Sequence, residues 1–147
     1  MAPRRLPIIG WREWASLPGL CDTPIKAKID TGARTSALHA FDLELVTDGA
    51  GSTLASFEIH PIQRAATGAA RVVVPVVDFR TVRSSNGTRE TRPVIEADVR
   101  IGDHDWTMDL TLTSRDEMGF RMLLGRAAVR RRFLVDPSRS YQQGKKL

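Results

Sequence analysis

Residues Asp30-Thr31-Gly32 place a carboxylate, a small hydroxyl and a backbone without a side chain in three consecutive positions. The preceding segment, 25–30, alternates apolar and polar residues, as does a half-buried β-strand that delivers its last residue to a turn. A carboxylate presented in this way can serve general acid–base chemistry. The alternative interpretation is an Asx-turn residue that caps the end of a strand.

Hydrolysis of a peptide bond by aspartates uses two carboxylates that share one proton, so that one activates water while the other donates to the carbonyl. The chain contains a single Asp-Thr-Gly, so the second carboxylate must come from a second copy. This interpretation predicts a homodimer with Asp30 of both subunits as the catalytic pair. Thr31 would cross-link the two loops, Gly32 would let their backbones approach, and Ala33 would keep the cleft floor small.

A second motif, Leu123-Leu124-Gly125-Arg126, lies near the C-terminus and precedes a short helix that we expect over 127–132. Together with the Asp-Thr-Gly loop, and in this order, it resembles the landmarks of retroviral-type aspartic peptidases. The resemblance implies that Leu124, Gly125 and Arg126 contribute to substrate binding.

Strand-like segments dominate the chain, which predicts an all-β fold. The best-defined pair is a hairpin over 94–113, in which alternating apolar residues of both strands share one buried face. Asn86-Gly87 is a strong signal for a second hairpin. The expected strands are Ile8–Trp14, Ile25–Asp30, Ala37–Val46, Leu54–Ile62, Arg71–Val77, Thr81–Arg83 with Thr88–Arg92, Val94–Ile101 and Trp106–Thr113.

Over residues 8–141 the chain resembles a bacterial family usually named ATP-dependent zinc proteases, which is often linked to RimK-type ATP-grasp ligases and is better described as retropepsin-like. The resemblance implies a closed retropepsin-like acid-protease barrel with a flap hairpin and one short C-terminal helix. The flap candidate is 84–88, with Ser85, Asn86 and Gly87 binding substrate. The matching segments are Gly10–Glu13, Lys26–Ala40, Ser85–Gly87, Arg115–Arg126 and Phe133–Ser138.

Two features depart from viral retropepsins. Arg34 stands where their catalytic loop has an acidic residue that binds substrate backbone, and the flap tip, 83–87, is not glycine-rich. A guanidinium near the catalytic pair can lower the carboxylate pKa or bind an acidic group of the substrate. The alternative is that Arg34 points to solvent or pairs with a surface carboxylate.

The residues argue against intrinsic zinc or ATP, so we expect no metal and no cofactor. His39, His60 and His104 are scattered and form no His-Glu-x-x-His motif, and no glycine-rich loop ends in Gly-Lys-Ser or Gly-Lys-Thr. ATP dependence would have to come from a partner such as an ATP-grasp ligase. His39, which leaves the catalytic loop, is expected to be a packed or hydrogen-bonding residue rather than a ligand.

Length and composition predict a single retropepsin-like domain over residues 1–147, with a short disordered tail at about 142–147. The lone Cys21 suits a reducing compartment, and no signal peptide or membrane span is apparent, so we expect a cytoplasmic protein. The net charge of +5 raises the possibility of nucleic-acid binding, but only 6% of residues are aromatic, which disfavours single-strand stacking sites.

Two functions therefore compete. One is a homodimeric aspartic endopeptidase that acts on a peptide or protein substrate. The other is a non-catalytic peptide-binding or regulatory β-domain that partners an ATP-grasp amino-acid ligase. The two differ in whether a pair of Asp30 carboxylates can meet.

Overall fold

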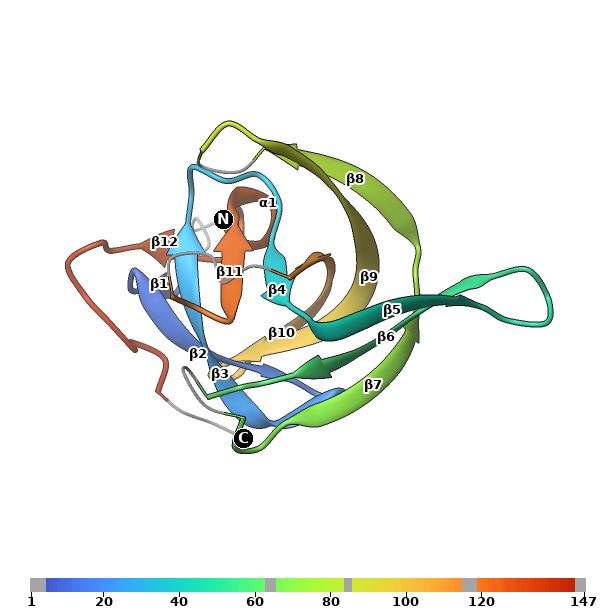
Figure 1. The fold of residues 1–147 in the computed structure, drawn as a ribbon. Coiled ribbons are helices and arrows are strands. Elements are labelled where there is room, and N and C mark those ends of the chain that lie inside the picture. Colours follow the sequence, from blue (N-terminus) through green and yellow to red (C-terminus); the bar gives the residue numbers. More distant parts are fainter. Residues whose placement is uncertain (1–4, 63–65, 84–85, 115–118, 145–147) are drawn as a thin grey trace.

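A β-sheet that closes on itself forms the centre of the computed structural model, which describes residues 5–62, 66–83, 86–114 and 119–144 (Figure 1). The one helix of this part of the chain, α1 (Arg126–Val129), is short, and none is long and apolar enough to cross a membrane. The strands are β1 (Ile8–Ile9), β2 (Arg12–Leu17), β3 (Cys21–Asp30), β4 (Ala37–His39), β5 (Phe41–Thr47), β6 (Thr53–Ile59), β7 (Ala70–Pro75), β8 (Asp78–Arg83), β9 (Arg89–Ile101), β10 (His104–Thr113), β11 (Met122–Gly125) and β12 (Leu134–Val135).

Six strands close the barrel in the order β10-β4-β11-β3-β2-β9, because β9 also pairs with β10. The predicted all-β barrel with one short C-terminal helix is confirmed. The core consists of apolar side chains from these strands and from β6, and their burial supplies the main driving force for the fold. The largest fully buried side chains include Leu17, Ile25, Leu38, Phe57, Ile95, Ile101, Leu110, Leu112 and Leu124.

The predicted hairpin over 94–113 is confirmed as β9 and β10, which pair from His104↔Ile101 to Thr111↔Val94. Ile95, Val99 and Ile101 are fully buried, as alternation predicts. Trp106 and Met108 lie on the same face of β10 but are only half-buried. Both side chains pack against the edge of the core, and their exposed parts are available to line a cleft.

Several predicted strand boundaries are wrong. The strand expected over 8–14 is interrupted at Gly10, and the one expected over 37–46 at Ala40. A Cβ on Gly10 would lie 2.1 Å from the carbonyl oxygen of Arg139, so the chain passes there too closely for any side chain. The helix expected over 127–132 is α1, one residue earlier and four residues long.

The segments 88–92 and 94–101, which the sequence predicts as separate strands, belong to one strand, β9, which runs through Pro93. Residues 89–94 of β9 pair with β8, whereas residues 94–101 pair with β10. Pro93 therefore lies where β9 has a partner on one side only, and a proline is tolerated at such an edge position.

The β8–β9 hairpin carries the flap candidate, whose residues 84 and 85 lie outside the described residues. Its arms pair from Asp78↔Val94 to Arg83↔Arg89. Asn86 accepts a hydrogen bond from the Thr88 backbone N–H (3.1 Å), and Gly87 has a φ of 84°, which suits glycine in a tight turn. β5, β6 and β7 form a separate three-stranded sheet, and the turn end of its β5–β6 hairpin projects from the molecule (Figure 1).

Glu13 fastens the C-terminal segment to the barrel. The side chain is fully buried, and its carboxylate accepts backbone N–H bonds from Gly10 (2.6 Å), Gln142 (2.8 Å) and Gln143 (3.1 Å). The tail predicted to be disordered from 142 thus begins with two anchored residues, while 145–147 lie outside the described residues.

Replacing Glu13 by alanine should destabilise the protein by about 3 kcal/mol, because buried N–H groups lose their acceptor. Chemical denaturation measures this free energy of unfolding. Glu44→Ala is the matched control, since Glu44 is exposed on β5 and should change stability by less than about 0.5 kcal/mol. Equal stability of the two variants would contradict the anchoring role of Glu13.

Candidate active site

Asp30 is the last residue of β3 and pairs with Gly125 of the parallel strand β11. Its Oδ1 accepts a hydrogen bond from the Gly32 backbone N–H (3.0 Å), and its carbonyl accepts one from Ala33 (3.2 Å). This is the geometry of an Asx-turn. Asp30 is nevertheless a half-buried residue that lines a cleft, so turn formation and a position for chemistry coexist.

The loop after Asp30 crosses the end of β11 and is held there by backbone hydrogen bonds. The N–H of Arg126 donates to the carbonyl of Ala33 (2.6 Å), and that of Ala127 donates to Arg34 (3.1 Å). A Cβ on Gly125 would lie 2.6 Å from the Thr35 carbonyl oxygen. Gly125 thus permits the close approach of two chain segments that shapes the Asp30 loop.

Ser36 anchors the far end of the same loop. Its buried Oγ accepts a hydrogen bond from the Gly125 N–H (3.0 Å). Its carbonyl accepts both the backbone N–H (3.0 Å) and the hydroxyl (2.8 Å) of Thr111 on β10. The loop is therefore tied to two different strands, which limits how far Asp30 can move.

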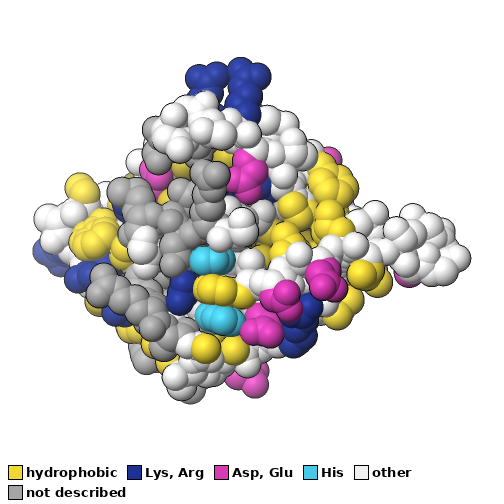
Figure 2. Space-filling model, in the orientation of Figure 1, with side chains coloured by type: hydrophobic (Ala, Val, Ile, Leu, Met, Phe, Trp, Pro, Cys, Tyr) yellow, Lys and Arg dark blue, Asp and Glu magenta, His cyan; other side chains and the backbone are white. Residues whose placement is uncertain are grey.

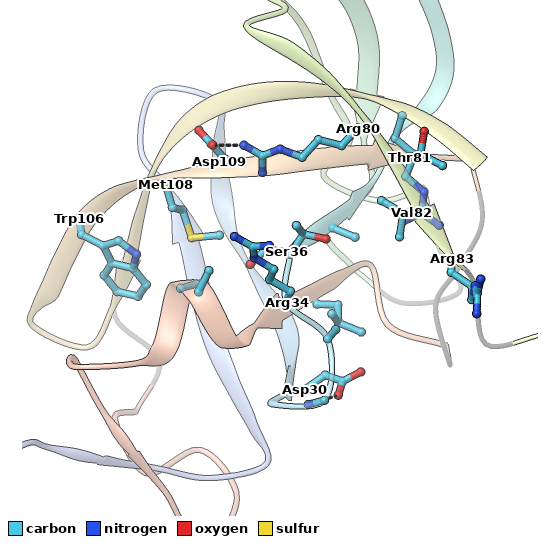
Figure 3. Close-up of a pocket in the computed structure, with 18 of the residues that line it drawn as sticks. Asp30, Arg34, Ser36, Arg80, Thr81, Val82, Arg83, Trp106, Met108 and Asp109 are labelled. Atoms are coloured by element: carbon cyan, nitrogen blue, oxygen red, sulfur yellow. Dashed lines mark hydrogen bonds and ion pairs between the residues drawn. The ribbon is translucent and has the colours of Figure 1, made fainter. Parts of the chain in front are cut away.

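A cleft of about 1100 Å³ lies between the Asp30 loop, β8 of the flap, β10 and α1. Figure 3 shows Arg34 projecting into it from the loop, Arg80 crossing its roof, and Trp106 and Met108 at one side. The lining residues are Asp30, Gly32–Ala37, Arg80–Arg83, Arg92, Trp106–Asp109, Leu123, Ala127, Ala128 and Arg132.

Positive charge dominates this lining. Five of the described lining residues are arginines, namely Arg34, Arg80, Arg83, Arg92 and Arg132, whereas only Asp30 and Asp109 carry carboxylates. Arg92 is 2% exposed and lies 3.6 Å from Glu90. Burying a guanidinium beside a cleft is costly unless it is paired. The positive charge of Arg92 is therefore a fixed part of the folded structure.

The structure brings most of the predicted loop residues to the cleft. Asp30, Gly32, Ala33 and Arg34 line it, while Thr31 is exposed beside them. Within the described part of the chain, a Cβ on Gly32 would meet only Asp30 Oδ1, at 3.2 Å, which leaves space there for another backbone.

The predicted flap and C-terminal residues take different positions. Asn86 and Gly87 are exposed at the flap tip and do not line the cleft, and Ser85 lies outside the described residues. Arg126 donates from Nη1 to the Thr31 carbonyl (2.9 Å), so it supports the loop rather than lining the cleft.

Leu124, which was predicted to contact substrate, does not line the cleft. Leu124 is fully buried and pairs with Ile29, whereas its neighbour Leu123 lines the cleft. Successive side chains of a strand point to opposite faces, so only one of the two leucines can face the cleft.

Sequence reasoning missed the residues of the cleft roof and side, among them Arg80, Arg92, Trp106, Met108 and Asp109. The sequence does place Trp106 and Met108 on the inward face of β10, because they continue the alternation of apolar residues from the buried Leu110. Segment 80–92 contains four arginines, but nothing in the sequence shows that part of it faces a cleft.

His39 packs as expected. Its ring stacks on Phe41 at a centroid distance of 3.9 Å, and Phe41 stacks on His60 at 3.7 Å (Figure 2). Among the described residues, no group of three His, Cys, Asp or Glu side chains could hold a metal ion. Burial raises the pKa of the Cys21 thiol, so this cysteine remains protonated and unreactive at neutral pH.

Three relatives cover most of the chain. Proteins from Shewanella pealeana and Parasynechococcus marenigrum, both named "Probable alpha-L-glutamate ligase", are 46% identical over 95% and 47% identical over 93% of this chain. The chain spans only about 30% of the length of these relatives. A crystal structure of a Legionella pneumophila protein of unknown function matches with a TM-score of 0.72 and 27% identity, covering 93% of this chain and 98% of that one.

A family model described as "RimB-like: Retropepsin-like aspartic endopeptidase RimB" matches residues 8–146. The match includes both strands that form the Asp30 loop, the flap hairpin and the anchored C-terminal segment. The chain belongs to this RimB-like, retropepsin-like family.

Proposed function

We propose that the chain is an aspartic endopeptidase whose catalytic pair is Asp30 of two subunits. The observation that carries the proposal is the position of Asp30, held at the end of β3 by the loop over Gly125 and facing a cleft under the flap. Two such carboxylates sharing a proton would supply the general base for water and the general acid for the scissile carbonyl.

The cleft of one chain lacks a suitable second carboxylate among its described lining residues. Asp109 is the only other acid there, and it forms an ion pair with Arg80 at 2.7 Å on the roof of the cleft. A second copy, placed so that the exposed Thr31 and Gly32 of both chains meet, completes the pair.

The arginines of the cleft favour an acidic peptide as substrate. Guanidinium groups bind carboxylates through charge-assisted hydrogen bonds, and several in one cleft would attract a run of them. The relatives named glutamate ligases point to the same chemistry, because such a ligase would make glutamate-containing peptides.

The same relatives support the proposal that this chain has a ligase as its partner. They carry a region like this chain within a protein more than three times as long. We infer that this chain works beside an ATP-grasp glutamate ligase in the cytoplasm. Regulation of such a ligase without hydrolysis is the second candidate function, favoured by the relatives that are named glutamate ligases.

The dimeric site is tested by measuring hydrolysis of a glutamate-rich peptide across a range of protein concentrations. Specific activity should rise with concentration and level off where sedimentation velocity shows that dimers predominate. Excess Asp30→Asn protein should suppress the wild type by forming mixed dimers, whereas an equal excess of Asp22→Asn protein, altered at an exposed position of β3, should not. Full activity of a monomer would exclude the shared pair.

A further inference from the structure

Arg80 spans the roof of the cleft and ends on Asp109. From β8, its Nη2 donates to Asp109 Oδ2 on β10 at 2.7 Å (Figure 3). Its Nε also lies 3.5 Å from Asp78 Oδ2. Both members of the Arg80–Asp109 pair line the cleft. Asp109 therefore occupies a guanidinium that faces the space a substrate would enter.

The pair is placed so that it can open. The side chains of Arg80 and Asp109 are 36% and 41% exposed, so water screens their attraction and competes for their hydrogen bonds. Exchanging Asp109 for another carboxylate would replace one charge-assisted hydrogen bond by an equivalent one.

Arg34 makes the opposite side of this space cationic. It reaches into the cleft below Arg80, and within the described residues its guanidinium forms no hydrogen bond or ion pair (Figure 3). A carboxylate entering between the two arginines would meet one free guanidinium and one already occupied. It would also meet the negative charge of Asp109.

We propose that Asp109 is a specificity-determining residue that occupies Arg80 in the free protein and yields it to a carboxylate of the bound peptide. This inference rests on the acidic substrate of the proposed function. Asp109 acts as an internal competitor, so removal of its charge should strengthen binding of acidic peptides and leave neutral ones unaffected.

Binding is measured in the Asp30→Asn background, where cleavage does not interfere, with hexaglutamate and hexaglutamine as probes. Adding Asp109→Asn, which keeps the shape and an acceptor oxygen, should lower the Kd for hexaglutamate about threefold to fivefold. The Kd for hexaglutamine should not change. Adding Arg80→Met should remove the gain, because the released guanidinium is then absent.

Asp105→Asn is the matched control. Asp105 also lies on β10 and pairs with an arginine, Arg100, at 2.9 Å, but it does not line the cleft. The Asp105→Asn variant has the same change in net charge as Asp109→Asn and should leave both Kd values unaltered. An equal gain from this variant would show that net charge alone is responsible and would overturn the proposal.

Two other outcomes also overturn it. Weaker hexaglutamate binding by Asp109→Asn would mean that Asp109 only positions Arg80, and equal tightening for both peptides would remove the carboxylate specificity. Failure of every variant to bind hexaglutamate would reject the acidic substrate as well. Hydrolysis of any peptide by the wild type, lost in Asp30→Asn, would still uphold the peptidase itself.

Discussion

Asp30→Asn should abolish peptide hydrolysis while leaving the barrel folded. The amide keeps an oxygen that can accept the hydrogen bond now made from the Gly32 N–H to Oδ1, so the turn should persist. It cannot take a proton from water or share one with a second carboxylate. We expect kcat to fall at least about 10³-fold, measured on a glutamate-rich peptide, with an unchanged thermal midpoint.

The matched control for this variant is Asp22→Asn, the same chemical change at the other end of β3. Asp22 is exposed and lies outside the cleft, so both activity and stability should match the wild type. Hydrolysis that survives in Asp30→Asn at the wild-type rate would sink the catalytic role of Asp30, and the regulatory alternative would then be favoured.

The barrel was predictable where alternation is regular. Apolar and polar residues alternate in segment 25–30 and in the hairpin around Ile95 and Leu110. They do so because each of these strands has one face in the core and one toward solvent or the cleft. The Asp30 turn was predictable for a related reason, since its three residues each have a role that few other residue types fill.

Other features depend on contacts that local sequence does not encode. Residues 122–125 are apolar throughout, so the sequence cannot show that Leu123 faces the cleft and Leu124 the core. That choice is made by the neighbouring strands β3 and β4. Arg80 and Asp109 are distant in sequence and meet only because β8 and β10 flank β9.

The stabilising role of Glu13 also depends on contacts that the local sequence does not encode. A glutamate in an alternating segment is expected at the surface. It is buried because the chain beyond Ser140 returns and presents N–H groups to it. The requirement for glycine at position 10 has the same origin, since the backbone of Arg139 and Ser140 passes too close for a side chain there.

Gly125→Ala should impair both stability and catalysis, because its new Cβ has no room. The nearest atoms are the carbonyl oxygens of Thr35 at 2.6 Å and Ala33 at 2.9 Å, which belong to the backbone of the Asp30 loop. Relieving the clash requires a shift of that loop. We expect a loss of about 3 kcal/mol in the free energy of unfolding and an activity loss of about 10²-fold, since small displacements of catalytic groups are costly.

Gly49→Ala provides the control for this change. A Cβ at Gly49 would have no heavy atom of the described residues within 4 Å, and its φ is not in the left-handed region, so the variant should behave like the wild type. Denaturant titration gives the stabilities, and peptide hydrolysis under conditions where both variants are folded gives the rates. Should Gly125→Ala keep wild-type activity, the close crossing of the loop over β11 could not be what positions Asp30.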